Sequence, residues 1–92
     1  MDTFQLSSEL SFQTVDDEYQ QLVDFIESNS SNAIAFDLSK VKSCDSAGLA
    51  LMIEAKQLSL HKNKTFSYNG VPKSVRNLAR FSGIEELFET QE

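Results

Sequence analysis

Three consecutive segments in the middle of the chain constrain its fold more than any other feature of the sequence. Residues 33–38 are apolar on both alternating sets of side chains, which is typical of a central strand covered on both sides. Residues 46–61 follow a helical pattern, and residues 65–68 follow a strand pattern. A strand, a helix and a strand in succession predict a mostly parallel sheet with helices packed against it.

Two shorter strand patterns precede this unit. Residues 3–6 and 9–14 contain Leu6, Leu10 and Phe12, which alternate with polar neighbours as in half-buried strands. The short separation between the two segments predicts that they pair as a hairpin.

A helix is expected on each side of the central unit. The first starts at Asp16 and Asp17, because acidic side chains favour the positive end of the helix dipole. The last follows Pro72 and ends near Gly83, a residue suited to a left-handed cap. The predicted fold is therefore α/β, with the order ββαβαβα and a four- to five-stranded sheet.

Length and charge narrow the class of protein. A chain of 92 residues has room for one core, so a single domain over residues 1–92 is expected. The net charge of −6 argues against nucleic acid as a partner, because binding a phosphate backbone depends on lysine and arginine. A single cysteine and the lack of a signal-peptide pattern favour the cytoplasm.

The sequence offers no pattern typical of an enzyme or of a cofactor site. Ser46 and the single histidine, His61, lie about 22 Å apart along one predicted helix, so they cannot form a nucleophile and its base. Neither a metal-ligand spacing nor a glycine-rich phosphate loop is present. We therefore expect a non-catalytic protein that needs no metal or other cofactor.

The junction between the central strand and the apolar helix carries the run Asp45-Ser46-Ala47-Gly48-Leu49. Ser46 is a candidate N-cap of the helix, and Asp45 could cap it equally well. Gly48 would allow a strand, a loop or a partner to approach the helix closely. Ser46 is also a candidate phosphoacceptor, because the positive end of a helix tolerates phosphate, although Asp45 repels it. Spacing alone leaves both capping and docking open.

Beyond these patterns, the chain resembles the STAS domain family, which includes bacterial anti-sigma factor antagonists and the cytoplasmic tails of anion transporters. The resemblance is carried by residues 35–88, AFDLSKVKSCDSAGLALMIEAKQLSLHKNKTFSYNGVPKSVRNLARFSGIEELF. The strand, the D-S-x-G-L turn, the next helix, the Y-N-G-V strand end and a last helix near L-A-R-F-S-G-I occur in family order. The first 30 residues match only in their pattern.

Within this family the run DLSKVKSCDSAGLALMIEAKQLS is most similar to the MlaB-type subgroup, the small STAS subunit of the Mla phospholipid-transport ABC complex. That subgroup tends to have Ala or Gly after the Ser or Thr, followed by Gly-Leu-Ala-Leu, and this chain has Ala47 and Ala50. Anti-sigma factor antagonists more often read Ser-Ser-Gly-Leu-Gly or Ser-Thr-Gly-Leu-Gly. The resemblance implies a subunit that binds and stabilises or regulates the transporter's ATPase subunit and serves outer-membrane lipid asymmetry.

The resemblance also implies the site residues. Ser46 matches the position that antagonists have phosphorylated by a serine kinase and that MlaB-like subunits place against the ATPase subunit; Asp45, Ala47, Gly48 and Leu49 complete the partner-binding surface. The alternative function is an anti-sigma factor antagonist switched by phosphorylation of Ser46. In both cases the partner is a protein, and the membrane is reached only through partner subunits at the inner-membrane face.

Overall fold

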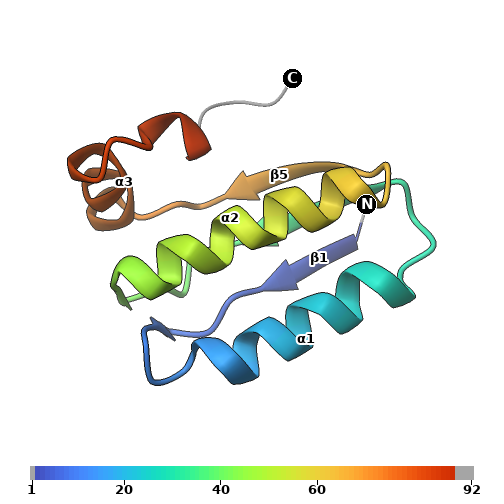
Figure 1. Cartoon of the computed structure of the whole chain (residues 1–92), viewed down its shortest axis with the longest axis horizontal. Coiled ribbons are helices and arrows are strands. Elements are labelled where there is room, and N and C mark those ends of the chain that lie inside the picture. Colours follow the sequence, from blue (N-terminus) through green and yellow to red (C-terminus); the bar gives the residue numbers. More distant parts are fainter. Residues whose placement is uncertain (1, 89–92) are drawn as a thin grey trace.

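The computed structural model describes residues 2–88, and Figure 1 shows how its helices and strands are arranged. The elements are β1 (Asp2–Gln5), β2 (Glu9–Leu10), α1 (Val15–Ser28), β3 (Ala33–Asp37), β4 (Ser43–Cys44), α2 (Ser46–His61), β5 (Thr65–Asn69), α3 (Lys73–Phe81) and the short 3-10 helix η1 (Glu85–Phe88). Helix α2 has the predicted bounds. Strand β4 is an element that the predicted order does not contain.

The described strands pair only in parallel, in two sheets. The larger sheet has the order β1-β3-β5, so that Phe36 at its centre lies between Phe4 and Tyr68. The smaller sheet pairs β2 with β4. Figure 1 shows α1 and α2 packed side by side, running roughly along the strands. The α/β class and the central position of β3 are confirmed, whereas the five strands are divided between two sheets.

The predicted hairpin between the first two strands is wrong. Strand β1 pairs with β3 and strand β2 pairs with β4, both in parallel. Ser7-Ser8, which joins them, lacks the glycine or asparagine that tight hairpin turns favour. Instead, the Ser7 hydroxyl and backbone N–H, the latter at 3.0 Å, both donate to the carboxylate of Glu18 in α1. This contact ties the link between the strands to the helix.

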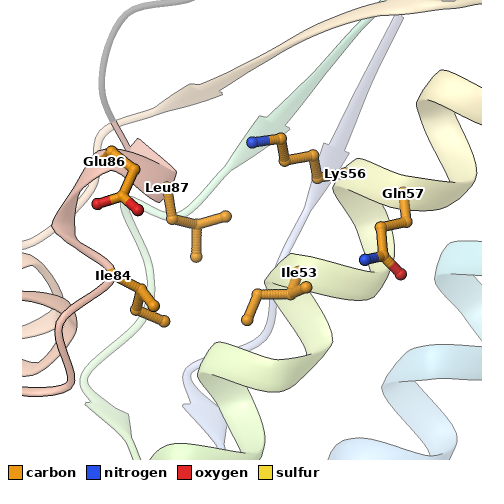
Figure 2. A pocket seen from close by; sticks show the side chains of 6 residues that line it. All are labelled: Ile53, Lys56, Gln57, Ile84, Glu86 and Leu87. Atoms are coloured by element: carbon orange, nitrogen blue, oxygen red, sulfur yellow. The ribbon is translucent and has the colours of Figure 1, made fainter.

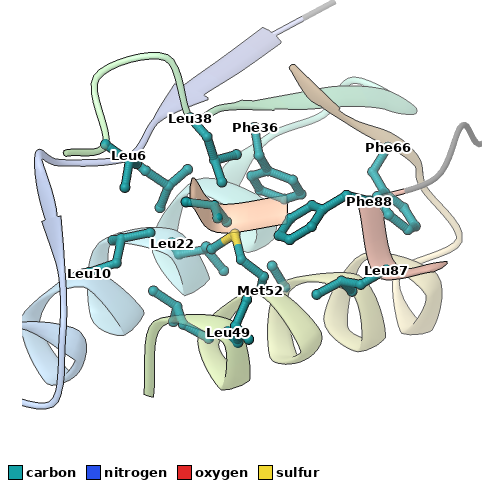
Figure 3. Close-up of a cluster of buried hydrophobic side chains, with 14 of the residues drawn as sticks. Leu6, Leu10, Leu22, Phe36, Leu38, Leu49, Met52, Phe66, Leu87 and Phe88 are labelled. Atoms are coloured by element: carbon teal, nitrogen blue, oxygen red, sulfur yellow. The ribbon is translucent and has the colours of Figure 1, made fainter. Parts of the chain in front are cut away.

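The buried core consists mainly of aliphatic side chains, with Phe36, Phe66 and Phe88 among them (Figure 3), and further aromatic residues pack against it. Phe25 of α1 packs between Phe4 and Phe36, with ring centroids 5.4 and 6.4 Å away. Tyr68 contacts Phe36, Phe66 and Phe88, and its hydroxyl donates to the Met52 carbonyl of α2 at 2.6 Å. The sheet, both long helices and η1 therefore share one core.

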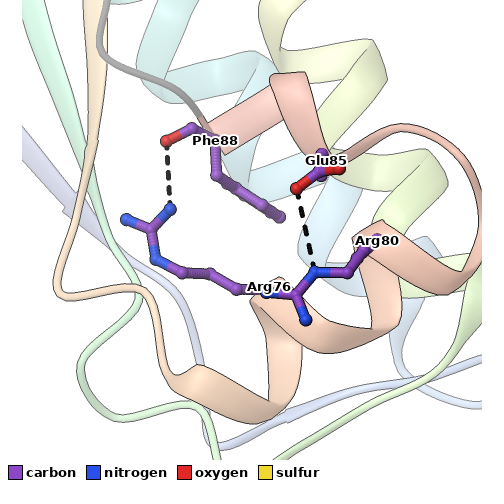
Figure 4. Close-up of polar contacts among 4 residues, drawn as sticks. All are labelled: Arg76, Arg80, Glu85 and Phe88. Atoms are coloured by element: carbon purple, nitrogen blue, oxygen red, sulfur yellow. Dashed lines mark hydrogen bonds and ion pairs between the residues drawn. The ribbon is translucent and has the colours of Figure 1, made fainter.

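Two polar contacts hold η1 against α3 (Figure 4). The guanidinium of Arg76 donates to the Phe88 carbonyl at 3.3 Å, and Arg80 lies 3.8 Å from Glu85. The second pair is exposed, so it stabilises the fold little. Gly83 has a φ of 76°, which confirms the predicted left-handed turn after α3. This turn brings Leu87 and Phe88 onto the core, where both are buried.

Gly48 lies where the smaller sheet presses against α2. A Cβ atom at this position would come within 2.5 Å of the Leu10 carbonyl oxygen and 2.7 Å of the Cys44 Sγ. Both neighbours belong to the β2–β4 pair, which therefore packs directly on the backbone of the helix. The close approach predicted for Gly48 is made by a strand of the chain itself.

This packing predicts the direction in which Gly48→Ala changes the free energy of unfolding. In an open helix position the change would stabilise by about 1 kcal/mol, because alanine is the better helix former. Here we expect a loss of about 1–3 kcal/mol from overpacking against Leu10. Urea unfolding measures the difference, with Ala50→Gly at an exposed position of α2 as the control for helix propensity. A Gly48→Ala variant more stable than the wild type would contradict the packing described.

Candidate functional site

Helix α2 is capped by Asp45 and not by Ser46. The Oδ1 atom of Asp45 accepts hydrogen bonds from the backbone N–H groups of Ala47 at 2.9 Å and Gly48 at 3.2 Å. Asp45 has an extended backbone, whereas Ser46 is the first helical residue and is exposed. Of the two capping residues that the sequence allowed, the structure selects Asp45. The Ser46 side chain is therefore not required to start the helix.

Asp45 also fixes the turn that precedes α1. Its Oδ2 atom accepts a hydrogen bond from the Phe12 N–H at 3.0 Å, and its own N–H donates to the Leu10 carbonyl at 3.1 Å. The carboxylate thus links residues 33 positions apart in the sequence. Because β2 and β4 are parallel, the starts of α1 and α2 lie at the same end of the molecule (Figure 1).

The electrostatics of this end follow from the same contacts. The Phe12 N–H lowers the pKa of Asp45 most, Gly48 and Ala47 lower it further, and desolvation opposes them. The pKa of the neighbouring Cys44 thiol is raised to about 11, first by desolvation and then by the charge of Asp45. Asp45 is therefore ionised at neutral pH, whereas Cys44 stays a thiol with little nucleophilic character.

Two of the five predicted site residues are buried within the chain itself. Leu49 is 3% exposed and belongs to the core, and Gly48 is buried against Leu10. Asp45 and Ser46 are exposed, and Ala47 is half-buried. Leu49 faces inward because it lies on the same helical stripe as Met52. Gly48 and Leu49 hold the surface in place, and the exposed Ala50 lies on the outer side of the helix instead.

The exposure of Phe12 at this end of the molecule was not predicted from the sequence. We expected residues 9–14 to form a strand with Phe12 inward, but β2 ends at Leu10 and the Phe12 side chain is 81% exposed. Residues 11–14 form a turn in which the Ser11 N–H donates to the Thr14 Oγ1 at 3.0 Å. Ser11 and Thr14, two residue types that favour turns, were the sequence feature that could have indicated a turn here.

Elsewhere the described residues bring no reactive groups together. Ser46 and His61 stand at opposite ends of α2, as expected. Within residues 2–88, no three His, Cys, Asp or Glu side chains form a group that could hold a metal ion. In the same range, no helix has the length and apolar composition of a membrane span.

A hollow of about 190 Å³ lies between α2 and η1 (Figure 2). Its lining is Ile53, Lys56, Gln57, Ile84, Glu86 and Leu87. The nearest of these along α2, Ile53, is seven residues from Ser46, or about 10 Å along the helix axis. The hollow is therefore separate from the surface around Ser46.

The arrangement of strands and helices is that of a STAS domain. It is similar to the solved structure described as the anti-sigma factor antagonist SpoIIAA in its unphosphorylated form, with a TM-score of 0.74. The likeness covers 98% of this chain and 78% of that one, at 17% sequence identity. At this identity it shows the fold alone.

The sequence matches the family model described as "Mlab, STAS domain" over residues 2–89. The chain therefore belongs to the STAS family, and the resemblance seen in its sequence is confirmed. A search of curated proteins finds no significant match.

Replacing Asp45 by alanine tests its role in holding this end together. At pH 7 we expect Asp45→Ala to lower the urea midpoint, because three backbone N–H groups lose their acceptor. The pKa of Asp45 in the folded protein is lower than its usual value of 3.8. Its charge therefore stabilises the fold fully at pH values above 3.8. This contribution disappears as the pH falls through the lowered value. Urea curves between pH 7 and pH 2 should therefore converge for the wild type and Asp45→Ala, and a constant difference would contradict this role.

Proposed function

We propose that this protein is a non-catalytic STAS subunit that binds the ATPase subunit of an ABC transporter for phospholipid and stabilises or regulates it. The observation that carries the proposal is the match of residues 2–89 to the family model described as Mlab. In this proposal the chain acts as one STAS domain over residues 1–92. It works on the cytoplasmic side and meets the inner membrane only through the other transporter subunits.

The contact surface in this proposal is the exposed start of α2. We define the Ser46 surface as Asp45, Ser46, Ala47 and Ala50, with Gly48 and Leu49 beneath it. Its backbone is fixed by the hydrogen bonds of Asp45, and its side chains are small or short. A partner can therefore approach this part of the helix closely without reordering long side chains, which would cost conformational entropy. These features support a docking surface better than a site for chemistry.

The regulatory partner of the alternative proposal is a serine kinase. The likeness of the fold to an anti-sigma factor antagonist and the exposure of Ser46 both favour this second function. A phosphate on Ser46 would lie at the positive end of α2, yet beside the ionised Asp45. The fold would then survive phosphorylation, while a partner docked on the Ser46 surface would be expelled.

Affinity purification from the native cells, with mass spectrometry, tests the first proposal. We expect the tagged wild type to recover an ABC ATPase and its permease. Ser46→Arg and Ala50→Arg should reduce that recovery at least about tenfold, because both place a long charged side chain within the contact. Leu49→Arg is unsuitable, since it would place a charge in the core.

The matched control for this experiment is Ser30→Arg. Ser30 is also an exposed serine. It follows the C-terminal end of α1, which lies about 20 Å along the helix axis from the end of the molecule where α2 and Ser46 start. It should recover the transporter subunits as the wild type does. Normal recovery with both Ser46→Arg and Ala50→Arg would place the interface elsewhere, and absence of transporter subunits from the wild-type sample would reject the proposal.

The alternative predicts labelling of Ser46. Incubation with a co-purified serine kinase and ATP should add one phosphate to the wild type and none to Ser46→Ala, as measured by intact mass. Ser46→Ala should stay bound to the kinase, whereas Ser46→Asp should not. A phosphate on another residue, or none, would contradict this reading.

A further inference from the structure

We propose that Phe12 is the apolar anchor of the contact with the ATPase subunit, and that its ring enters an apolar socket on that subunit beside the Ser46 surface. This inference rests on the proposed function and adds to it a residue and the kind of partner surface that it fits. Aromatic side chains that fill pockets on a partner commonly supply much of the binding energy of an interface.

The exposure of Phe12 is the first observation behind this proposal. Its side chain is 81% exposed, whereas Phe4, Phe25, Phe36, Phe66 and Phe88 all pack in or against the core. Phe81, at the end of α3, is the other strongly exposed phenylalanine among the described residues, at 88%. Single exposed apolar residues are normal on protein surfaces, so exposure alone does not distinguish the two.

The rigid attachment of Phe12 to the Ser46 surface does distinguish them. The Phe12 N–H is bonded to Asp45, the residue that also caps α2. On either side, the Ser11 N–H donates to the Thr14 Oγ1 and the Thr14 N–H donates to the Ser11 carbonyl, both at 3.0 Å. The backbone that carries the ring is thus held before any partner arrives, and a preordered anchor loses little entropy on binding.

The small residues at the start of α2 and the exposed Phe12 ring indicate the shape and chemistry of the partner surface. Ser46, Ala47 and Ala50 are small residues at the start of α2, and the Phe12 backbone is hydrogen-bonded to Asp45, the cap of that helix, while Phe12 itself is 81% exposed. A concave apolar socket matches a projecting phenylalanine, whereas a flat or charged face would leave the ring in water or bury a charge. The partner surface is therefore an apolar socket on the ATPase subunit.

This placement also explains how a charge at residue 46 would act. A socket that closes over Phe12 excludes water from the neighbouring Ser46. A phosphate there would lose its hydration beside Asp45, which is itself an anion. Phosphorylation would then release the partner without unfolding the chain.

The test measures binding of the purified chain to the purified ATPase subunit that co-purifies with it, by isothermal titration calorimetry. We expect Phe12→Ala to raise the Kd about 30-fold or more, as for an aromatic hot spot. Phe12→Leu, which keeps an apolar side chain, should fall between Phe12→Ala and the wild type. Phe81→Ala is the matched control and should leave the Kd within about twofold, in line with other surface substitutions. Urea midpoints of all three variants should equal that of the wild type.

The outcomes separate this inference from the function on which it rests. If Phe12→Ala binds like the wild type while Ser46→Arg does not, Phe12 is not the anchor and the proposed function stands. If Phe81→Ala weakens binding and Phe12→Ala does not, the partner covers α3 and the inference is wrong. If the wild type does not bind the ATPase subunit, the proposed function and the inference both fail.

Discussion

Parallel pairing of β1, β3 and β5 is the constraint from which the rest of the structure follows. Parallel neighbours require each connection to return across the sheet, and here the long helices α1 and α2 make these returns. Both helices therefore start at the same end of the molecule. The short pair β2–β4 lies just before these two starts and brings Leu10 against Gly48. The exposed surface at this end is thus a product of the topology.

The sequence predicted those elements whose side-chain patterns are long enough to have a period. The bounds of α2 and the central position of β3 could be read from apolar residues that repeat over several turns or pairs. Strands β2 and β4 contain two residues each, so they have no period to detect. Their parallel pairing depends on contacts between residues 34 positions apart, such as Glu9 with Ser43, and no local pattern records it.

The candidate site was found by its motif, but its geometry needed the structure. The Asp-Ser-Ala-Gly-Leu run predicted where α2 starts, although composition cannot decide which of two adjacent capping residues is used. Asp45 caps α2, so the Ser46 hydroxyl is not needed as a cap. A change of the Ser46 side chain therefore leaves the cap of α2 in place. The exposure of Phe12 could not be predicted, because an alternating pattern of apolar residues does not show at which residue a strand ends.

The pairing of β1 also has a consequence for the order in which the chain acquires structure. Asp2 pairs with Ile34 and Glu9 with Ser43, so neither of the first two strands has a partner close to it in the sequence. During synthesis, the first 14 residues must wait until residue 44 has been made before both pairings can form. Helix α1 can form in that interval from local contacts, whereas the sheets close late and over long loops. The first two strands are therefore ordered only after residues 33–44 are available to pair with them.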